Sequence, residues 1–137
     1  MAYPFVLINP LSRFMKSMKT MKTRMTIKQS IVELVVQRAA GYCEKCGGPA
    51  SESMALHHRK LKSRGGKDAV ANLIWVHHGC HNMSTDSIHA NPAYATDKGW
   101  MVSSWEEPED APMALPDGRI VLLQENGKIT NLQGGNL

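Results

Sequence analysis

The sequence predicts a small α+β protein in which two short strands are flanked by helices and followed by a β-hairpin. Apolar residues recur at helical spacing over 26–40, and short apolar runs at 54–58 and 72–78 each end in two histidines. A turn signal lies between two further apolar runs after position 118. A chain of 137 residues buries one modest core, so we expect a single compact main domain.

The first element, over 26–40, has the pattern of an amphipathic helix. Thr26 and Gln29 have the spacing of a capping box, and Gly41 supplies a C-terminal stop. The apolar residues that recur on one face are Ile27, Ile31, Leu34 and Val35.

Two strands and a second helix are expected to follow. "MALHH" at 54–58 and "NLIWVHH" at 72–78 have the length of short strands, and "SRGG" between them indicates a turn in a basic loop. Asn91 as N-cap, Pro92 at the first helical position and Gly99 after the end frame a short helix.

Composition divides the chain into four parts. A basic, flexible extension is followed by the main domain, an exposed linker that is acidic and rich in proline, and a hairpin that turns at Asn126-Gly127. The predicted boundaries are 1–25, 26–105, 106–117 and 118–137. An isolated hairpin is marginally stable in water, so this one is expected to dock on the domain or on a partner.

The charge balance suits a polyanionic partner without requiring one. Lys and Arg outnumber Asp and Glu by 16 to 12, and the first acidic residue is Glu33. The front half is therefore cationic, which fits nucleic acid, although a solvated basic tail explains it equally well.

The cysteine count points to a reduced compartment. Three cysteines would leave one unpaired in a disulfide framework, no apolar stretch approaches the roughly 20 residues that span a bilayer, and the opening "MAYPFVLINP" lacks a preceding basic region. We expect a cytoplasmic protein.

Two ligand pairs predict a structural zinc site. Cys43-x-x-Cys46 and His77-x-x-Cys80 each offer two ligands from one tight turn, and Cys3His is an accepted tetrahedral set. Such a closed site holds two chain segments together and leaves no position for substrate. His78 is an alternative to His77 as the fourth ligand, and the spacing favours His77.

The stretch "LHHRKLKSRGGKDAVANLIWVHHGCHN" resembles the HNH endonuclease motif of the zinc-knuckle type found in bacteria and bacteriophages. A histidine pair ends a strand, a Ser-x-Gly-Gly loop and an Asn-Leu follow, and a knuckle closes with Cys-His. The resemblance extends over about residues 30–104 and implies a ββα-metal fold. His77 stands where the family usually has cysteine.

The resemblance implies separate roles for the paired histidines. By analogy with the family, His57 binds the catalytic divalent ion, His58 is the general base, and His81 is a second metal ligand. Adjacent side chains on a strand point to opposite faces, so His57 and His58 are not expected to share one task. Asn72 is expected to brace the loop and orient the base.

The third ligand of the catalytic ion departs from the family spacing. Thr85 stands where a histidine is usual, and His89 arrives after an apparent insertion. His89 could reach the site on a continuous helix or through a looped-out insertion, and Asp86 is the fallback. The ion implied is Mg²⁺ or Mn²⁺, with Ni²⁺ or Zn²⁺ able to occupy imidazole ligands.

A basic run follows the candidate base. Beside a phosphodiesterase site, its side chains are expected to anchor DNA phosphates, whereas their bland interpretation is a solvated loop. The predicted anchors are Arg59, Lys60, Lys62, Arg64 and Lys67. Nothing in the sequence indicates base-specific contacts.

The implied activity is divalent-metal-dependent hydrolysis of DNA phosphodiester bonds. In bacteriophages some enzymes of this family sit beside the terminase and assist genome packaging, which would place this one in the host cytoplasm. The alternatives are a zinc-knuckle DNA-binding module with a degenerate nuclease site, and a toxin-like or restriction nuclease with the same chemistry.

Overall fold

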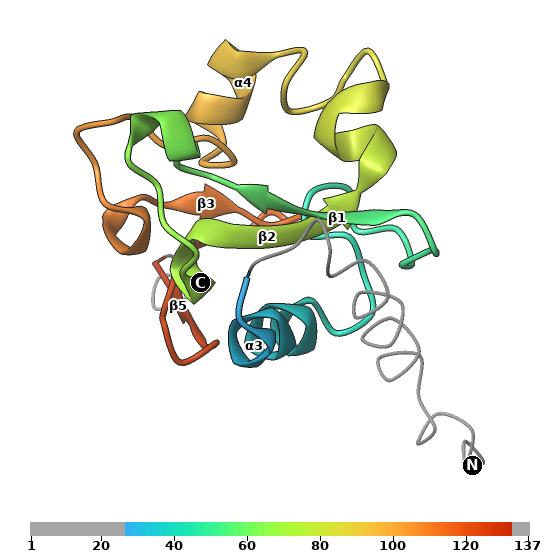
Figure 1. The fold of residues 1–137 in the computed structure, drawn as a ribbon. Helices are drawn as coiled ribbons and strands as arrows, with labels where there is room; N and C mark the ends of the chain where they lie inside the picture. The colour runs from blue at the N-terminus through green and yellow to red at the C-terminus, as the bar shows by residue number, and fades with distance from the viewer. Residues whose placement is uncertain (1–26, 133–137) are drawn as a thin grey trace, which may run out of the picture.

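The computed structural model describes residues 27–132. Figure 1 shows a two-stranded sheet between a long helix on one side and shorter helical segments on the other, with a second small sheet beside it. The regular elements are α3 (Gln29–Ala39), β1 (Met54–His58), β2 (Leu73–His77), the π-helical turn η3 (Gly79–Met83), α4 (Pro92–Asp97), β3 (Met113–Ala114), β4 (Ile120–Leu123) and β5 (Ile129–Asn131). Short 3₁₀ turns occupy Lys62–Arg64, Val70–Asn72 and Pro108–Asp110.

Helix α3 confirms the predicted amphipathic helix, with Lys28 at its N-cap. The proposed capping box depends on Thr26, which lies outside the described residues. The helix stops where Ala40 and then Gly41 adopt positive φ angles of 55° and 94°, so the predicted C-terminal glycine is in place.

The central sheet is an antiparallel pair, and its two faces belong to different parts of the core. His57 of β1 lies opposite Ile74, and His58 lies opposite Leu73. Leu73 and Trp75 pack with α3, whereas Ile74 and Val76 pack with residues from α4 and the second sheet. Because both faces are covered, β2 is apolar at four successive positions and not alternating.

The C-terminal hairpin docks on the main domain. Strands β3, β4 and β5 form one antiparallel sheet, and Val121 and Leu123 are fully buried in the core that contains β2 residues. The carboxylate of Glu125, in the hairpin loop, accepts hydrogen bonds from the backbone amides of Val70 and Ala71.

Residues 106–117 have the composition of an exposed linker, yet part of this segment is packed into the domain. Pro108, Ala111 and Met113 are buried, and Met113 begins strand β3. The acidic side chains Glu106, Glu107, Glu109 and Asp110 remain exposed, which is why composition alone suggests a linker.

Arg59 holds this C-terminal segment against the strands. Its side chain is fully buried, and its guanidinium donates hydrogen bonds of 2.7–3.0 Å to four backbone carbonyls. These carbonyls belong to Ala71, Gly99, Pro108 and Ala111. Burial lowers the pKa of Arg59 to about 10, so the group stays charged at neutral pH.

A second buried arginine ties α3 to the sheet. Arg38 forms a two-pronged ion pair with Glu44, at 2.8 and 2.9 Å, and donates to the carbonyls of Val70 and Leu73. Glu44 in turn accepts a hydrogen bond from the backbone amide of Trp75 at 3.0 Å.

Within residues 27–132 no helix is long and apolar enough to cross a bilayer.

Replacing Arg59 should destabilise the fold strongly. Arg59→Met keeps much of the side-chain volume but leaves four buried carbonyls without their donor, and we expect the free energy of unfolding to fall by about 3–5 kcal/mol. Arg119→Met is the matched control, because Arg119 pairs with Asp117 on the exposed surface and should cost at most about 1 kcal/mol. Urea unfolding measures both; equal losses would contradict the role of Arg59.

Candidate functional site

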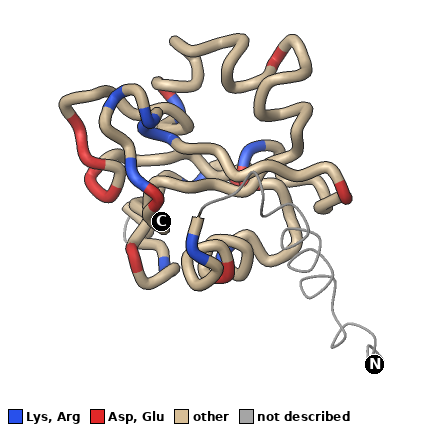
Figure 2. The backbone as a smooth tube through the Cα atoms, in the orientation of Figure 1, with Lys and Arg blue, Asp and Glu red and all other residues tan. Residues whose placement is uncertain are grey.

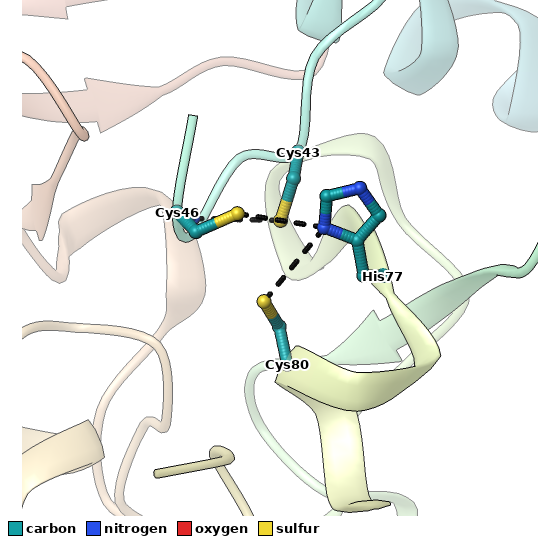
Figure 3. A group of neighbouring side chains, drawn as sticks. All are labelled: Cys43, Cys46, His77 and Cys80. Atoms are coloured by element: carbon teal, nitrogen blue, oxygen red, sulfur yellow. Dashed lines mark hydrogen bonds between the residues drawn. The ribbon is translucent and has the colours of Figure 1, made fainter. Parts of the chain in front are cut away.

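Three cysteines and one histidine converge from both sides of the central strands. Cys43 and Cys46 lie in the turn after α3, His77 ends β2, and Cys80 lies in η3. Figure 3 shows the four side chains pointing toward one another. His77 Nδ1 lies 3.4 Å from Cys46 Sγ and 3.9 Å from Cys80 Sγ, and all four ligand atoms lie within 4.8 Å of one another. His78 is not part of this group.

Backbone groups form hydrogen bonds that orient the side chains of this cluster. The amides of Lys45 and Cys46 donate to Cys43 Sγ, and the amide of Gly48 donates to Cys46 Sγ, each at 3.4 Å. His77 donates its Nε2 hydrogen to the carbonyl of Pro49 at 2.9 Å, which leaves the Nδ1 lone pair facing the sulfurs.

The donor set fits Zn²⁺. Zinc–ligand bonds of normal length in a tetrahedron place sulfur and nitrogen ligands roughly 3.5–3.8 Å apart, close to the separations here. Burial raises the pKa of Cys43, but backbone amide donors outweigh it and lower that pKa overall. Burial and the neighbouring Cys43 raise the pKa of Cys80 to about 12. A divalent cation would offset this repulsion between sulfurs.

Three histidines form a second cluster, which η3 joins to the first through the neighbouring residues Cys80 and His81. His57 comes from β1, His81 from η3 and His89 from the loop before α4, and their ring nitrogens lie within 4.8 Å of one another. The Nε2 atoms of His81 and His89 are 3.1 Å apart, near the roughly 3 Å expected between adjacent nitrogen ligands of one metal ion.

His57 is the most constrained member of this cluster. It is 1% exposed, and its Nε2 hydrogen bonds to the carbonyl of Trp100 at 2.8 Å, so Nδ1 is the atom left for a metal. Burial, above all, lowers the pKa of His57 to about 3 and that of His81 to about 4. Both rings are therefore neutral at pH 7 and keep the lone pairs that a metal ion requires.

A looped-out insertion brings His89 to the cluster. The π-helical turn ends at Met83, so the continuous helix considered from the sequence does not form. The chain then folds back, and the amides of Ile88 and His89 donate to the carbonyls of Cys80 and His81. Ile88 is 1% exposed and anchors the return.

Asp86, the fallback ligand, lies outside this group. Its side chain is fully exposed to solvent and accepts a 2.6 Å hydrogen bond from the Ser84 hydroxyl, and it is not among the clustered donors.

His58 lies at the end of β1, next to the three-histidine cluster. Positive charge on its ring would lower the pKa values of both His57 and His81, so the groups are within electrostatic reach. Its Nε2 lies 2.8 Å from Asp68 Oδ1. Asp68 was not among the residues expected from the sequence; its place just after the Gly-Gly loop is the only signal that could have identified it.

Asn72 fastens the ends of the basic loop. Its Oδ1 accepts from the amide of Lys60 at 2.7 Å, and its Nδ2 donates to the carbonyls of Lys60 and Lys67. Gly66 packs so closely that a Cβ there would lie 1.7 Å from the Lys60 carbonyl oxygen. These contacts agree with the bracing role expected for Asn72.

The basic run divides into buried and exposed members. Arg59 was expected to contact phosphate, but its buried guanidinium is occupied by backbone carbonyls and cannot reach a ligand. Lys60 is 7% exposed and lies 3.7 Å from the carboxylate of Glu107. Lys62, Arg64 and Lys67 are exposed, and Lys62 lies 3.5 Å from the Asp68 carboxylate.

Loss of a cysteine should remove zinc and cooperative folding together. We expect Cys43→Ser and Cys80→Ser to lose bound zinc, measured by elemental mass spectrometry, and the sharp thermal transition, measured by circular dichroism. His78→Ala is the control and should keep both, because His78 lies outside the cluster. A stable, zinc-free cysteine variant would contradict the structural role.

His89 should matter for binding of a second metal ion, and Asp86 should not. In zinc-loaded protein, His89→Ala is expected to weaken Mn²⁺ or Ni²⁺ binding by at least about tenfold. Loss of a residue that only hydrogen-bonds to a metal ligand already lowers metal affinity by about that factor. Isothermal titration calorimetry measures the affinity. Asp86→Ala should bind as the unmodified protein does; a comparable loss would place its carboxylate in the site.

Comparison with known families agrees with this geometry. The family model described as HNH endonuclease matches residues 43–87, which include the Cys3His cluster, His57, His58 and His81. No curated protein and no solved structure matches the chain. The mixed α+β architecture, with two strands, a following helical turn and a Cys3His cluster, is that of a ββα-metal domain. The chain therefore contains an HNH endonuclease domain at residues 43–87.

Proposed function

We propose that the protein is a divalent-metal-dependent endonuclease that hydrolyses phosphodiester bonds of DNA. The observation that carries the proposal is the convergence of His57, His81 and His89 beside His58, inside a domain of the HNH family. The Cys3His cluster serves as scaffold, because four protein ligands would leave zinc no position for substrate.

The three-histidine cluster would hold the catalytic ion. When bound, such an ion stabilises negative charge on the phosphate and on the departing oxygen. A set of three imidazoles without a carboxylate suits Mn²⁺, Ni²⁺ or Zn²⁺ better than Mg²⁺, which prefers oxygen ligands. Among the ions expected from the family, Mn²⁺ therefore fits this centre better than Mg²⁺.

His58 would act as the general base. It accepts one proton from a water molecule while the water oxygen bonds to phosphorus, the phosphorus–oxygen bond to the leaving group breaks, and the departing oxygen takes a proton from solvent. The products are a phosphomonoester and an alcohol. Imidazole is suited to this task near neutral pH.

The exposed members of the basic loop would grip the DNA backbone. Lys62, Arg64 and Lys67 project from the loop that Asn72 fastens, and DNA binding should weaken as salt rises. Figure 2 shows positive and negative residues interspersed over the chain, and Lys60 is close to Glu107. Among the described residues, we therefore assign the attraction of DNA phosphates to this loop.

The rival function is a DNA-binding module with a degenerate nuclease site, which the unusual spacing of His89 suggested. The return of the chain at Ile88 favours the nuclease, since it supplies the third histidine despite the insertion. Assistance of phage genome packaging beside a terminase, in the cytoplasm of a bacterial host, stays a prediction from the family resemblance.

His58→Ala should abolish cleavage without unfolding the protein. We expect purified protein to nick or linearise plasmid DNA with Mn²⁺ or Mg²⁺, EDTA to stop the reaction, and the variant to lose at least about a hundredfold in rate because the base is gone. Agarose electrophoresis follows the cleavage, while zinc content and the unfolding temperature serve as controls. Undiminished cleavage by His58→Ala would refute the assignment of the base, and DNA binding without any cleavage would favour the rival.

A further inference from the structure

We propose that Asp68 is a positioning residue for His58: its carboxylate accepts the Nε2 hydrogen, so that Nδ1 is the nitrogen that takes the proton from water. The inference rests on the proposed function, because it assumes that His58 is the general base. Asp68 itself would touch neither the substrate nor the metal.

The geometry of the pair supports this assignment. His58 Nε2 and Asp68 Oδ1 are 2.8 Å apart, with side-chain exposures of 19% and 27%, so solvent only partly competes for the contact. Among the described residues none forms a hydrogen bond with His58 Nδ1. That nitrogen is therefore left for a water molecule.

The carboxylate of Asp68 determines which ring nitrogen of His58 carries the hydrogen. Neutral imidazole carries one hydrogen, and an ionised carboxylate can only accept, so the hydrogen must sit on Nε2 while the contact persists. The hydrogen bond from His58 is the largest influence on the Asp68 pKa and lowers it; burial opposes this effect, and Lys62 adds to it. Asp68 is thus ionised at neutral pH.

The loop that carries Asp68 is held at both ends. Asn72 bonds to the carbonyls of Lys60 and Lys67, which directly precedes Asp68. Its Oδ1 also holds the amide of Lys60, two residues after the base. Asn72 thereby fixes the chain beside both members of the His58–Asp68 pair, which is how a residue remote from the substrate can orient the base.

An ion pair with Lys62 is a competing explanation for the position of Asp68. Its ammonium lies 3.5 Å from the same Oδ1 atom, so Asp68 could serve merely to neutralise this lysine or to brace the loop. Lys62 is 60% exposed and this pair is longer than the contact to His58, which makes it the weaker interaction. Substitution of Lys62 separates the two explanations.

The test uses the full-length, zinc-loaded protein and four variants. Asp68→Ala removes the acceptor, Asp68→Asn keeps an oxygen that can accept, and Lys62→Ala removes the lysine alone. Asp117→Asn is the matched control, an ion-paired carboxylate of the other sheet region. Ring ¹⁵N chemical shifts at pH 8.5 report the His58 tautomer, and steady-state cleavage of a short duplex with Mn²⁺ gives kcat and KM.

We expect the unmodified protein, Lys62→Ala and Asp117→Asn to show the Nε2–H tautomer of His58. Asp68→Ala should show a mixture of tautomers and lose about ten- to a hundredfold in kcat with KM changed less than about twofold. Asp68→Asn should recover most of the tautomer preference and part of kcat. Lys62→Ala should affect KM and not kcat.

Two results would overturn the proposal. An unchanged tautomer in Asp68→Ala would show that other groups orient His58, and a mixed tautomer with unchanged kcat would show that the orientation has no catalytic consequence. If the unmodified protein binds DNA but cleaves none, the nuclease function fails instead, and the ¹⁵N shifts alone still decide whether Asp68 fixes the ring.

Discussion

The Cys3His cluster is the constraint on which the rest of the domain depends. It joins the turn after α3 to the end of β2 across 31 residues of sequence, at Cys46 and His77. A small domain has few other means of closing such a loop, because loop-closure entropy must be offset before the strands gain from packing. Once Cys80 is held, the next residue, His81, has little freedom, so the scaffold site directly places a member of the second cluster.

The three-histidine cluster extends beyond the segment that matches the family model. The match ends at residue 87, whereas His89 completes the three-histidine cluster and the Trp100 carbonyl fixes the ring of His57. Arg59 binds the neighbouring carbonyl of Gly99 and two carbonyls of the segment that follows. The C-terminal region therefore helps to orient these histidines, and a chain cut at residue 87 would lack it.

Features that follow from local pattern were predictable from the sequence. The Cys-x-x-Cys and His-x-x-Cys spacing gave the Cys3His cluster, strand alternation separated His57 from His58, and Gly41 marked the end of α3. These three predictions are confirmed because each depends on chain geometry over a few residues. The assignment of catalytic roles within the cluster stays a prediction.

Features that depend on long-range burial were not predictable. Arg59 looked like one more cation of a basic run, since charged residues are rarely buried without a charged partner, yet four backbone carbonyls distant in sequence satisfy it. A role for Asp68 was not predicted, because only its contact with His58 in the folded protein indicates one. The looped return at Ile88 depends on a buried side chain that the spacing of histidines does not reveal.

The burial of Arg59 also changes how the basic loop must work. With Arg59 internal and Lys60 close to Glu107, only part of the run is left to attract phosphates, and exposed acidic residues of 106–110 lie beside it. Among the described residues of this run, the proposed contact with DNA phosphates therefore rests on fewer cations than the sequence suggests. The cations that remain, Lys62, Arg64 and Lys67, belong to the loop that also carries Asp68 to His58. The proposed phosphate contacts and the proposed orientation of His58 would thus come from different residues of one loop, which Asn72 holds in place.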